Sequence, residues 1–92
     1  MDIRGFQWDE RNEGHIAQHG VAIFEVEESM LYRHPLFTRG REGKHIAHGA
    51  TEEGRHLFIV FVAKEAGMVR VITARDMVEK EKRFYRKRKG VR

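Results

Sequence analysis

The stretch that decides the fold is Leu57-Phe58-Ile59-Val60-Phe61-Val62, inside a predicted strand over residues 55–63. Alternate residues of a strand point to opposite faces, so a run that is apolar at every position predicts a central strand covered on both sides. Glu65-Ala66-Gly67 predicts a turn, and the Val-rich segment 68–74 predicts the next strand. Because the connection is so short, the two strands must be antiparallel.

Two helices are predicted on the N-terminal side of this sheet. Asp9 can cap a helix that runs to about His19, and Gly20 is typical of the residue that follows a helix C-terminus. Apolar residues at helical spacing predict a second helix over residues 23–32. The tight connection between the two predicts a compact helical pair.

The remaining elements complete a small α+β domain. Segments 36–39 and 45–49 are short candidate strands, which brings the predicted antiparallel sheet to three or four strands. Asp76 lies three residues before Glu79, the spacing of a capping box, and this predicts a C-terminal helix. The order of helix, helix, sheet and helix indicates one α+β domain over residues 1–92.

The composition favours a soluble protein of the cytoplasm. The chain has no cysteine, which suits a reducing compartment. Its longest apolar run, residues 57–63, is much shorter than the roughly 18 residues of a membrane span. Residues 1–8 lack the apolar core of a signal peptide. We therefore expect no membrane contact.

The net charge of +4 is concentrated at the C-terminal end. Residues 80–92 hold eight bases and one acid, a charge of +7, so residues 1–79 carry the balance of −3. A basic end of this kind favours contact with RNA or DNA. The alternative is a solvated basic tail, frayed over residues 86–92.

Three blocks of sequence occur in order along nearly the whole chain. They are Phe6-Gln7-Trp8-Asp9 with His19-Gly20-Val21, then Gly49 with Gly54-Arg55 and the apolar strand, then Arg70-Val71-Ile72-Thr73-Ala74-Arg75 with residues 81–85. In order and spacing these blocks resemble the BrnT family of toxins from bacterial toxin–antitoxin pairs. The chain departs from the family pattern at Gln18, at His34-Pro35 and at Lys44-His45. The last pair replaces an acidic residue of the family pattern that is a candidate catalytic or positioning group.

The resemblance implies a compact RelE-like ribonuclease fold and cleavage of RNA that inhibits translation. It also implies a DNA-binding antitoxin of the BrnA type that neutralises the toxin, with operator DNA contacted only through the complex. We expect a metal-independent endoribonuclease without a cofactor. Such an enzyme needs a base for the ribose 2′-OH, an acid for the leaving oxygen and cations for the phosphate.

Two arginines of the third block are the first catalytic candidates. Arg75 lies at a strand end next to a predicted helix N-terminus, where backbone N–H groups also favour anions. Arg70 lies inside a Val- and Ile-rich strand, which indicates a face open to solvent or ligand. Strict alternation places the two on opposite faces, unless the strand twists or ends early. The structural alternatives are an ion pair for Arg75 and a solvated position for Arg70.

Glu81 and His19 are the candidate proton-transfer groups. Glu81 is a candidate base or an orienter of an arginine, and a helix-surface salt bridge is the alternative. His19 is the natural acid or base near neutral pH, but its place at a helix end also suits the helix dipole. Trp8 is interpreted as a core or interface anchor.

The candidate RNA-binding residues lie around these groups. They are Arg55, Lys80, Arg83, Tyr85 and Arg86. Tyr85 can stack on a base, but its spacing suits a core residue equally well. The nuclease hypothesis requires the guanidinium groups of the sheet and of the last helix to meet in one pocket.

Two alternatives to a nuclease remain. The first is a non-catalytic module that binds nucleic acid or a repressor, which the missing acid at Lys44-His45 favours slightly. The second is a metal-binding protein, because His15 and His19 have helical i, i+4 spacing and His45 lies near His48. Without a Glu between the first pair, or any cysteine, we predict no metal site.

Overall fold

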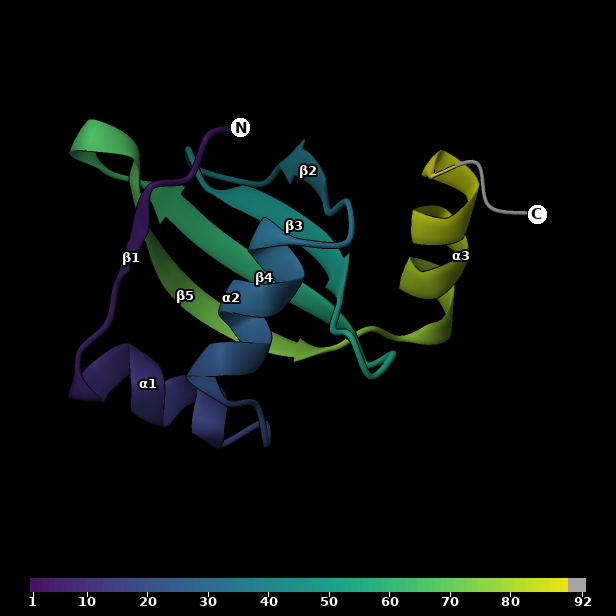
Figure 1. Ribbon diagram of the computed structural model, residues 1–92, viewed down its shortest axis with the longest axis horizontal. Helices are drawn as coiled ribbons and strands as arrows, with labels where there is room; N and C mark the ends of the chain where they lie inside the picture. Colours follow the sequence, from purple (N-terminus) through teal and green to yellow (C-terminus); the bar gives the residue numbers. More distant parts are fainter. Residues whose placement is uncertain (90–92) are drawn as a thin grey trace.

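The computed structural model describes residues 1–89, which form an α+β fold, as predicted. The elements in chain order are β1 (Gly5–Gln7), α1 (Glu10–Ala17), α2 (Ile23–Leu31), β2 (Leu36–Arg39), β3 (His45–Ala50), β4 (His56–Ala63), a short 3-10 helix (Glu65–Gly67), β5 (Met68–Asp76) and α3 (Glu79–Arg88). Figure 1 shows the two N-terminal helices against the sheet and α3 beyond its end.

The sheet has the strand order β1-β5-β4-β3-β2 within the described residues. The apolar strand β4 is central, as predicted, and pairs antiparallel with β3 and β5. The sheet has five strands within residues 1–89, at least one more than the three or four antiparallel strands expected from the sequence. The additional strand, β1, is only three residues long and pairs parallel with β5. Its length is too small for alternation to be recognisable in the sequence.

One face of the sheet forms the core. Leu57, Ile59 and Phe61 of β4 are fully buried on this face, against Val26 and Met30 of α2. Burying a side chain of this size is worth about 1.5–3 kcal/mol. The core therefore holds the helical pair on the sheet.

The opposite face of the sheet is not covered along its length. Phe58, Val60 and Val62 alternate with the buried residues of β4 and are only half-buried. The expectation that β4 is covered on both sides is therefore wrong. We call this side the open face; α3 contacts only the end of it where β4 begins and β5 ends.

A β-bulge in β5 changes which side chains share the open face. Val60 pairs with Thr73 and Phe61 pairs with Val71, so Ile72 is an extra residue. An extra residue reverses the alternation beyond it. Strict alternation would put Arg70 and Arg75 on different faces of the sheet. Because of the bulge, each of them pairs with an open-face residue of β4, so both lie on the open face.

The start of α1 is fixed by a reciprocal cap. The Asp9 side chain accepts from the backbone N–H of Arg11 and Asn12, as the sequence predicts for a cap. The buried Asn12 side chain accepts from the Asp9 N–H and donates to the carbonyls of Gln7 and Val71. One amide thus joins β1, α1 and β5.

Asn12→Ala is expected to lower the free energy of unfolding by about 2 kcal/mol, because it removes the side-chain donor to the buried Val71 carbonyl and to the partly buried Gln7 carbonyl. Urea denaturation measures this. The matched control is Arg11→Ala, an exposed neighbour expected to change stability by less than about 0.5 kcal/mol. Equal effects of the two substitutions would contradict the bridging role of Asn12.

The cap predicted for the last helix is wrong. Asp76 is the final residue of β5, and its carboxylate binds Arg55 rather than a helix N-terminus. The helix begins two residues later than expected, with Val78 as the N-cap and Glu81 accepting from the Val78 N–H. The shift places Glu81 at the start of α3, beside the end of β5.

The second helix also differs in detail from its predicted apolar face. Phe24 and Leu31 contribute to the apolar spacing that predicts this helix, but Phe24 is 69% exposed and Leu31 is 42% exposed. The basic segment 86–88 is helical, while residues 90–92 of the predicted tail lie outside the described residues. None of the helices within residues 1–89 is long and apolar enough to cross a bilayer.

Candidate functional site

Three side chains form a row across the open face at the end near α3. His48 of β3 pairs with Phe58 of β4, and Phe58 pairs with Arg75 of β5. The His48 and Phe58 rings meet edge to face, with centroids 5.2 Å apart. The Arg75 guanidinium carbon lies 4.2 Å from the centre of the Phe58 ring. Strand register thus places an imidazole and a guanidinium on either side of one aromatic ring.

The first turn of α3 adds a carboxylate to this row. Glu81 accepts two hydrogen bonds from Arg75, from Nη1 at 2.8 Å and Nη2 at 2.9 Å. Arg75 Nη1 also donates to the Asp76 carbonyl. Because Glu81 is held by the Val78 N–H as well, the helix start fixes the plane of the guanidinium. Nothing in residues 1–89 accepts from Arg75 Nε.

Phe84, one helical turn later, covers the imidazole. Its ring centroid lies 5.1 Å from that of His48, and the Arg88 guanidinium carbon lies over the Phe84 ring at 5.4 Å from the same centroid. Phe84 is itself 37% exposed, so it covers the imidazole from the solvent side and does not belong to the buried core. We call this candidate site the catalytic row, after the role proposed for it below; its members are His48, Phe58 and Arg75 of the sheet with Glu81 and Phe84 of α3.

His48 is a buried polar residue with unused hydrogen-bonding capacity. It is 5% exposed, and its Nδ1 has no hydrogen-bond partner among residues 1–89. Burial lowers the pKa of the imidazole, because desolvation disfavours its charged form, while the Glu81 carboxylate acts in the opposite direction. Buried polar atoms are nearly always satisfied in folded proteins, so an unsatisfied one marks a candidate reactive group.

The carboxylate and the guanidinium stabilise each other's charge. The hydrogen bonds from Arg75 lower the pKa of Glu81, and those to Glu81 raise the pKa of Arg75. A carboxylate with a lowered pKa and three donors is a weak base. The geometry therefore favours Glu81 as the residue that orients Arg75, one of the two roles expected for it.

The burial of His48 makes stability depend on pH. Its pKa in the folded chain lies below the ordinary value of 6.5, so the unfolded chain binds more protons as the pH falls through that value. The stability contributed by neutral His48 is therefore present above pH 6.5 and is lost below it. The lowered carboxylate pKa values act at more acidic pH, below 4.5.

Urea denaturation at several values between roughly pH 5 and 8 is expected to show this fall in the wild-type chain. His48→Gln is expected to flatten it, and His19→Gln, at an exposed position, is expected to leave it unchanged. The same slope in the wild type and in His48→Gln would contradict the assignment.

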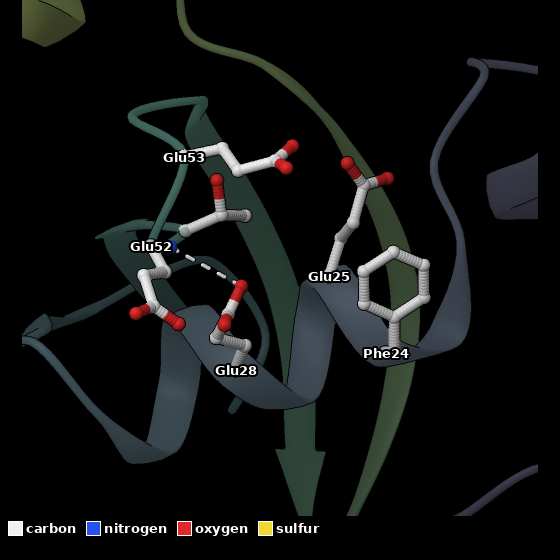
Figure 2. A pocket seen from close by; sticks show the side chains of 6 residues that line it. Phe24, Glu25, Glu28, Glu52 and Glu53 are labelled. Atoms are coloured by element: carbon white, nitrogen blue, oxygen red, sulfur yellow. Dashed lines mark hydrogen bonds between the residues drawn. The ribbon is translucent and has the colours of Figure 1, made fainter.

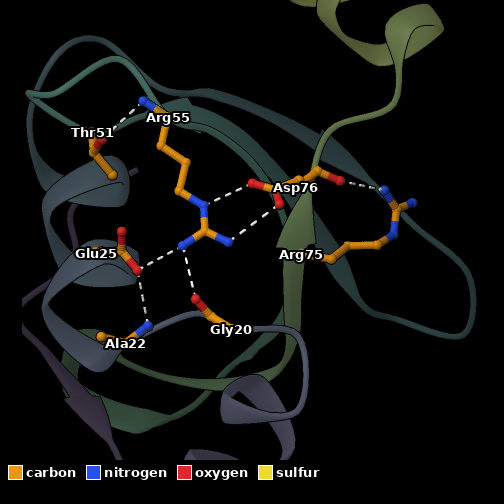
Figure 3. A network of polar contacts seen from close by, with 7 residues as sticks. All are labelled: Gly20, Ala22, Glu25, Thr51, Arg55, Arg75 and Asp76. Atoms are coloured by element: carbon orange, nitrogen blue, oxygen red, sulfur yellow. Dashed lines mark hydrogen bonds and ion pairs between the residues drawn. The ribbon is translucent and has the colours of Figure 1, made fainter.

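Arg55 performs a structural role rather than joining the row. Its guanidinium binds the Asp76 carboxylate, the Gly20 carbonyl and Glu25 of α2 (Figure 3). The hydrogen bonds to Asp76 raise the pKa of Arg55 and lower that of Asp76. Figure 3 shows the Arg75 guanidinium on the other side of Asp76 from that of Arg55, where it donates to the Asp76 backbone carbonyl.

Arg70 and His19 also lie away from the catalytic row. Arg70 forms an ion pair with Asp9 at 3.0 Å. Although it shares the open face with Arg75, their β4 partners are four residues apart, or roughly 13 Å along the strand. His19 is exposed beyond the end of α1, where its ring meets that of His15. The expected single pocket of guanidinium groups is therefore not present among the described residues.

The other predicted RNA-binding residues lie on α3. Lys80, Arg83 and Arg86 are exposed, and Arg86 is 3.8 Å from Glu79. Tyr85 is buried, with its ring edge to face against His56. Its position agrees with the core interpretation, although its hydroxyl reaches the Arg33 carbonyl at 3.5 Å.

Sequence reasoning missed part of the row. The sequence spacing of His45 and His48 indicates only a candidate metal pair, but His45 lies on the core face, stacked on Phe61. No group of three or more metal-ligating side chains gathers within residues 1–89. The signal for His48 was its alternation with the buried Ala47 and Gly49, which places it on the other side of β3.

A hollow on another part of the surface, beside α2, is chemically unsuited to a polyanion. Figure 2 shows it between α2 and the turn before β4, with glutamate side chains around it. It has a volume of about 400 Å³ and is lined by Phe24, Glu25, Glu28, Thr51, Glu52 and Glu53. The carboxylates repel phosphate, so this hollow does not suit a polyanionic ligand.

Comparisons with known proteins agree with the fold. The crystal structure of the Brucella abortus ribonuclease toxin BrnT matches with a TM-score of 0.65 and 18% identity, covering 82% of this chain and 97% of that chain. A search of curated proteins found no match. The family model described as ribonuclease toxin, BrnT, of type II toxin–antitoxin systems matches residues 8–81. This range includes His48, Phe58, Arg75 and Glu81 of the row. Because the family model matches most of the chain, the chain belongs to the BrnT family of ribonuclease toxins.

Proposed function

We propose that this chain is a metal-independent endoribonuclease that inhibits translation in the cytoplasm. Internal attack of a ribose 2′-OH on the adjacent phosphate would break the RNA strand. The single observation that carries the proposal is the catalytic row, in which an unsatisfied buried imidazole and a fixed guanidinium lie on either side of Phe58. Membership of a family of ribonuclease toxins supports it.

Each member of the row has a distinct role in this reaction. Neutral His48 accepts the proton of the 2′-OH, for which a pKa lowered by burial keeps it unprotonated at neutral pH. Arg75 stabilises the charge that develops on the phosphate. Its Nε–H and the second N–H of Nη2, which Glu81 does not use, are the donors for this role. Glu81 holds the guanidinium in place. The acid that protonates the leaving 5′-oxygen is His48, once it carries the proton of the 2′-OH, or a cationic side chain of α3.

The basic side chains of α3 hold the RNA backbone. Lys80, Arg83 and Arg86 are exposed on this helix, and Arg88 adds a guanidinium next to Phe84. Contacts of this kind release counterions, so the affinity for RNA falls steeply as salt is raised. Arg55 and Arg70 form structural ion pairs and take no part in the reaction.

The partner that restrains this activity is an antitoxin, as type II systems require. We propose that it is a DNA-binding protein of the BrnA type, and that operator DNA is contacted only through the complex. The open face, with its half-buried apolar side chains, and the adjacent α3 offer one continuous surface that a partner could cover.

The test is incubation of the purified chain with single-stranded RNA in EDTA. We expect cleavage, with products that end in a 2′,3′-cyclic phosphate, since the 2′-OH is the nucleophile. RNA with 2′-deoxy substitutions should stay intact. Cleavage that requires a divalent metal would contradict the mechanism.

The alternative is a binding module without catalysis. It is favoured by the ion pairs that engage Arg55, Arg70 and Arg75 in the free chain. Salt-sensitive RNA binding with no products under any condition would support it. Expression of the chain alone, with growth followed, separates the two possibilities in cells, since a toxin arrests growth and a module does not.

A further inference from the structure

A separate hollow opens next to the catalytic row. It is lined by Arg33 and His34, by Ala50 of β3 and by Tyr85 of α3, and its volume is about 400 Å³. Sites for small organic molecules have volumes of roughly 300–1,000 Å³ and combine apolar walls with a few polar groups. The hollow has both, from a methyl group, an aromatic ring, an imidazole and a guanidinium.

The hollow lies one step along the sheet from His48. Ala50 is two residues further along β3, on the same face, which is roughly 7 Å away. Ala50 pairs with His56, whose ring meets Tyr85, and Tyr85 directly follows the Phe84 that covers His48. A single strand of RNA whose phosphate reaches Arg75 and His48 therefore has its neighbouring nucleotide at this hollow.

The backbone at the mouth of the hollow is strained. Arg33 and His34 have φ angles of 61° and 58°, in the left-handed region that non-glycine residues seldom adopt. Both side chains are exposed, so their burial does not offset the strain. The Tyr85 hydroxyl, which donates to the Arg33 carbonyl at 3.5 Å, ties the turn to α3. Strain of this kind persists where a conformation is needed, and it clusters at ligand sites.

The charges around the hollow determine which part of a nucleotide enters it. On the far side of Arg33, Glu28 and Glu52 line the next hollow, and their carboxylates repel a phosphate. Arg75 and Arg88 lie on the other side, with the catalytic row. The phosphate therefore stays near the row, and the base is the part that turns toward Arg33 and His34.

We propose that Arg33, His34, Ala50 and Tyr85 form a nucleobase subsite that selects the base on one side of the cleaved bond. The proposal rests on the proposed ribonuclease function. Imidazole and guanidinium planes stack on unpaired bases, and the edges of the Arg33 and His34 side chains hydrogen-bond to them. Ala50 forms a floor, since a larger side chain there would fill the hollow.

The first test is sequencing of the ends produced from a random-sequence RNA. The wild-type chain is expected to favour one base, or a pair of related bases, at one position next to the cut. His34→Ala and Arg33→Ala are expected to reduce this preference at least five-fold, with a higher KM and a similar kcat on the best substrate. The control is Lys64→Ala, an exposed substitution at the opposite end of β4.

A second variant separates recognition from folding. His34→Gly relieves the left-handed strain, so it is expected to raise the Tm while it removes the base preference. A role limited to the turn would leave the cleavage profile unchanged. An unchanged profile in all three variants would overturn the proposed subsite while leaving the nuclease proposal intact.

A third measurement covers the outcome in which the wild-type chain does not cleave RNA. Nuclear magnetic resonance titration with the four nucleoside 3′-monophosphates is expected to shift the His34 and Tyr85 ring signals, with the His15 ring as a reference. Shifts without cleavage would contradict the nuclease and keep the subsite. No shift with any of the four nucleotides would overturn the subsite.

Discussion

Arg75→Ala is expected to lower the rate of RNA cleavage by about 100-fold or more, the usual effect of removing a donor that stabilises a developing negative charge. The substitution also releases Glu81, which then places an unpaired carboxylate next to His48. The measurement is single-turnover cleavage of a labelled RNA, together with circular dichroism to establish that the variant is folded. Arg75→Lys is expected to recover only part of the rate, because lysine lacks the planar pair of donors that Glu81 orients.

The matched control for this substitution is Arg70→Ala. Arg70 lies in the same strand and on the same face, and it too forms an ion pair with a carboxylate, but on Asp9 rather than beside His48. We expect a change in rate of less than about three-fold, because Arg70 lies roughly 13 Å along the strand from Arg75 and does not reach the same phosphate. Equal losses from the two substitutions would mean that charge alone, and not the catalytic row, supports cleavage.

Gly49→Ala is expected to lower the free energy of unfolding by about 3 kcal/mol. A Cβ at this position of β3 would collide with the carbonyl oxygen of Ser29 in α2, and it would lie 3.1 Å from the Ser29 carbonyl carbon. Both atoms belong to the backbone, so a side-chain rotation cannot relieve the contact. The helix must move away from the sheet, which opens the core around Val26.

The control for this stability prediction is Gly14→Ala. Gly14 lies inside α1, and an added Cβ would have no atom within 4 Å. Alanine there is expected to stabilise the chain by about 0.5–1 kcal/mol, since it limits the unfolded backbone and favours the helix. Urea denaturation of both variants gives the comparison. Destabilisation of less than about 1 kcal/mol by Gly49→Ala would show that α2 does not need this close approach.

Local signals in the sequence were sufficient for most of the elements. The Asp9 cap, the Gly20 stop and the uninterrupted apolar strand each act over a few neighbouring residues, and all three are found in the structure. The strand β1 and the cap of α3 were not predictable in this way. Strand β1 depends on pairing with the distant strand β5. The predicted cap of α3 fails because the Asp76 carboxylate binds Arg55 and not the N-terminus of the helix.

The candidate site depends on contacts between distant elements even more strongly. Arg75 and Glu81 are six residues apart, and their adjacency could be foreseen from the strand–helix boundary. His48 reaches Arg75 only through the register of three strands, which no local pattern specifies. The bulge at Ile72 likewise reverses the face of Arg70, and its position is set by the pairing of β4 with β5.

The uneven charge of the sequence has a clear structural counterpart. Glutamates surround the hollow beside α2, whereas the exposed bases lie on α3 at the end of the sheet. The net charge alone predicts contact with nucleic acid, and the distribution of charge in the structure indicates which part of the surface would make that contact. This distribution supports the proposal that RNA binds at the end of the molecule that carries His48 and Arg75.

The most direct test is a crystal structure of the chain with a short RNA that carries a single 2′-deoxy nucleotide at the cleavage position and therefore stays intact. We predict a phosphate within hydrogen-bond distance of Arg75, with the imidazole of His48 facing the position of the missing 2′-OH. A phosphate bound instead at Arg70 or at Arg55, with His48 still covered by Phe84, would contradict the proposed catalytic row.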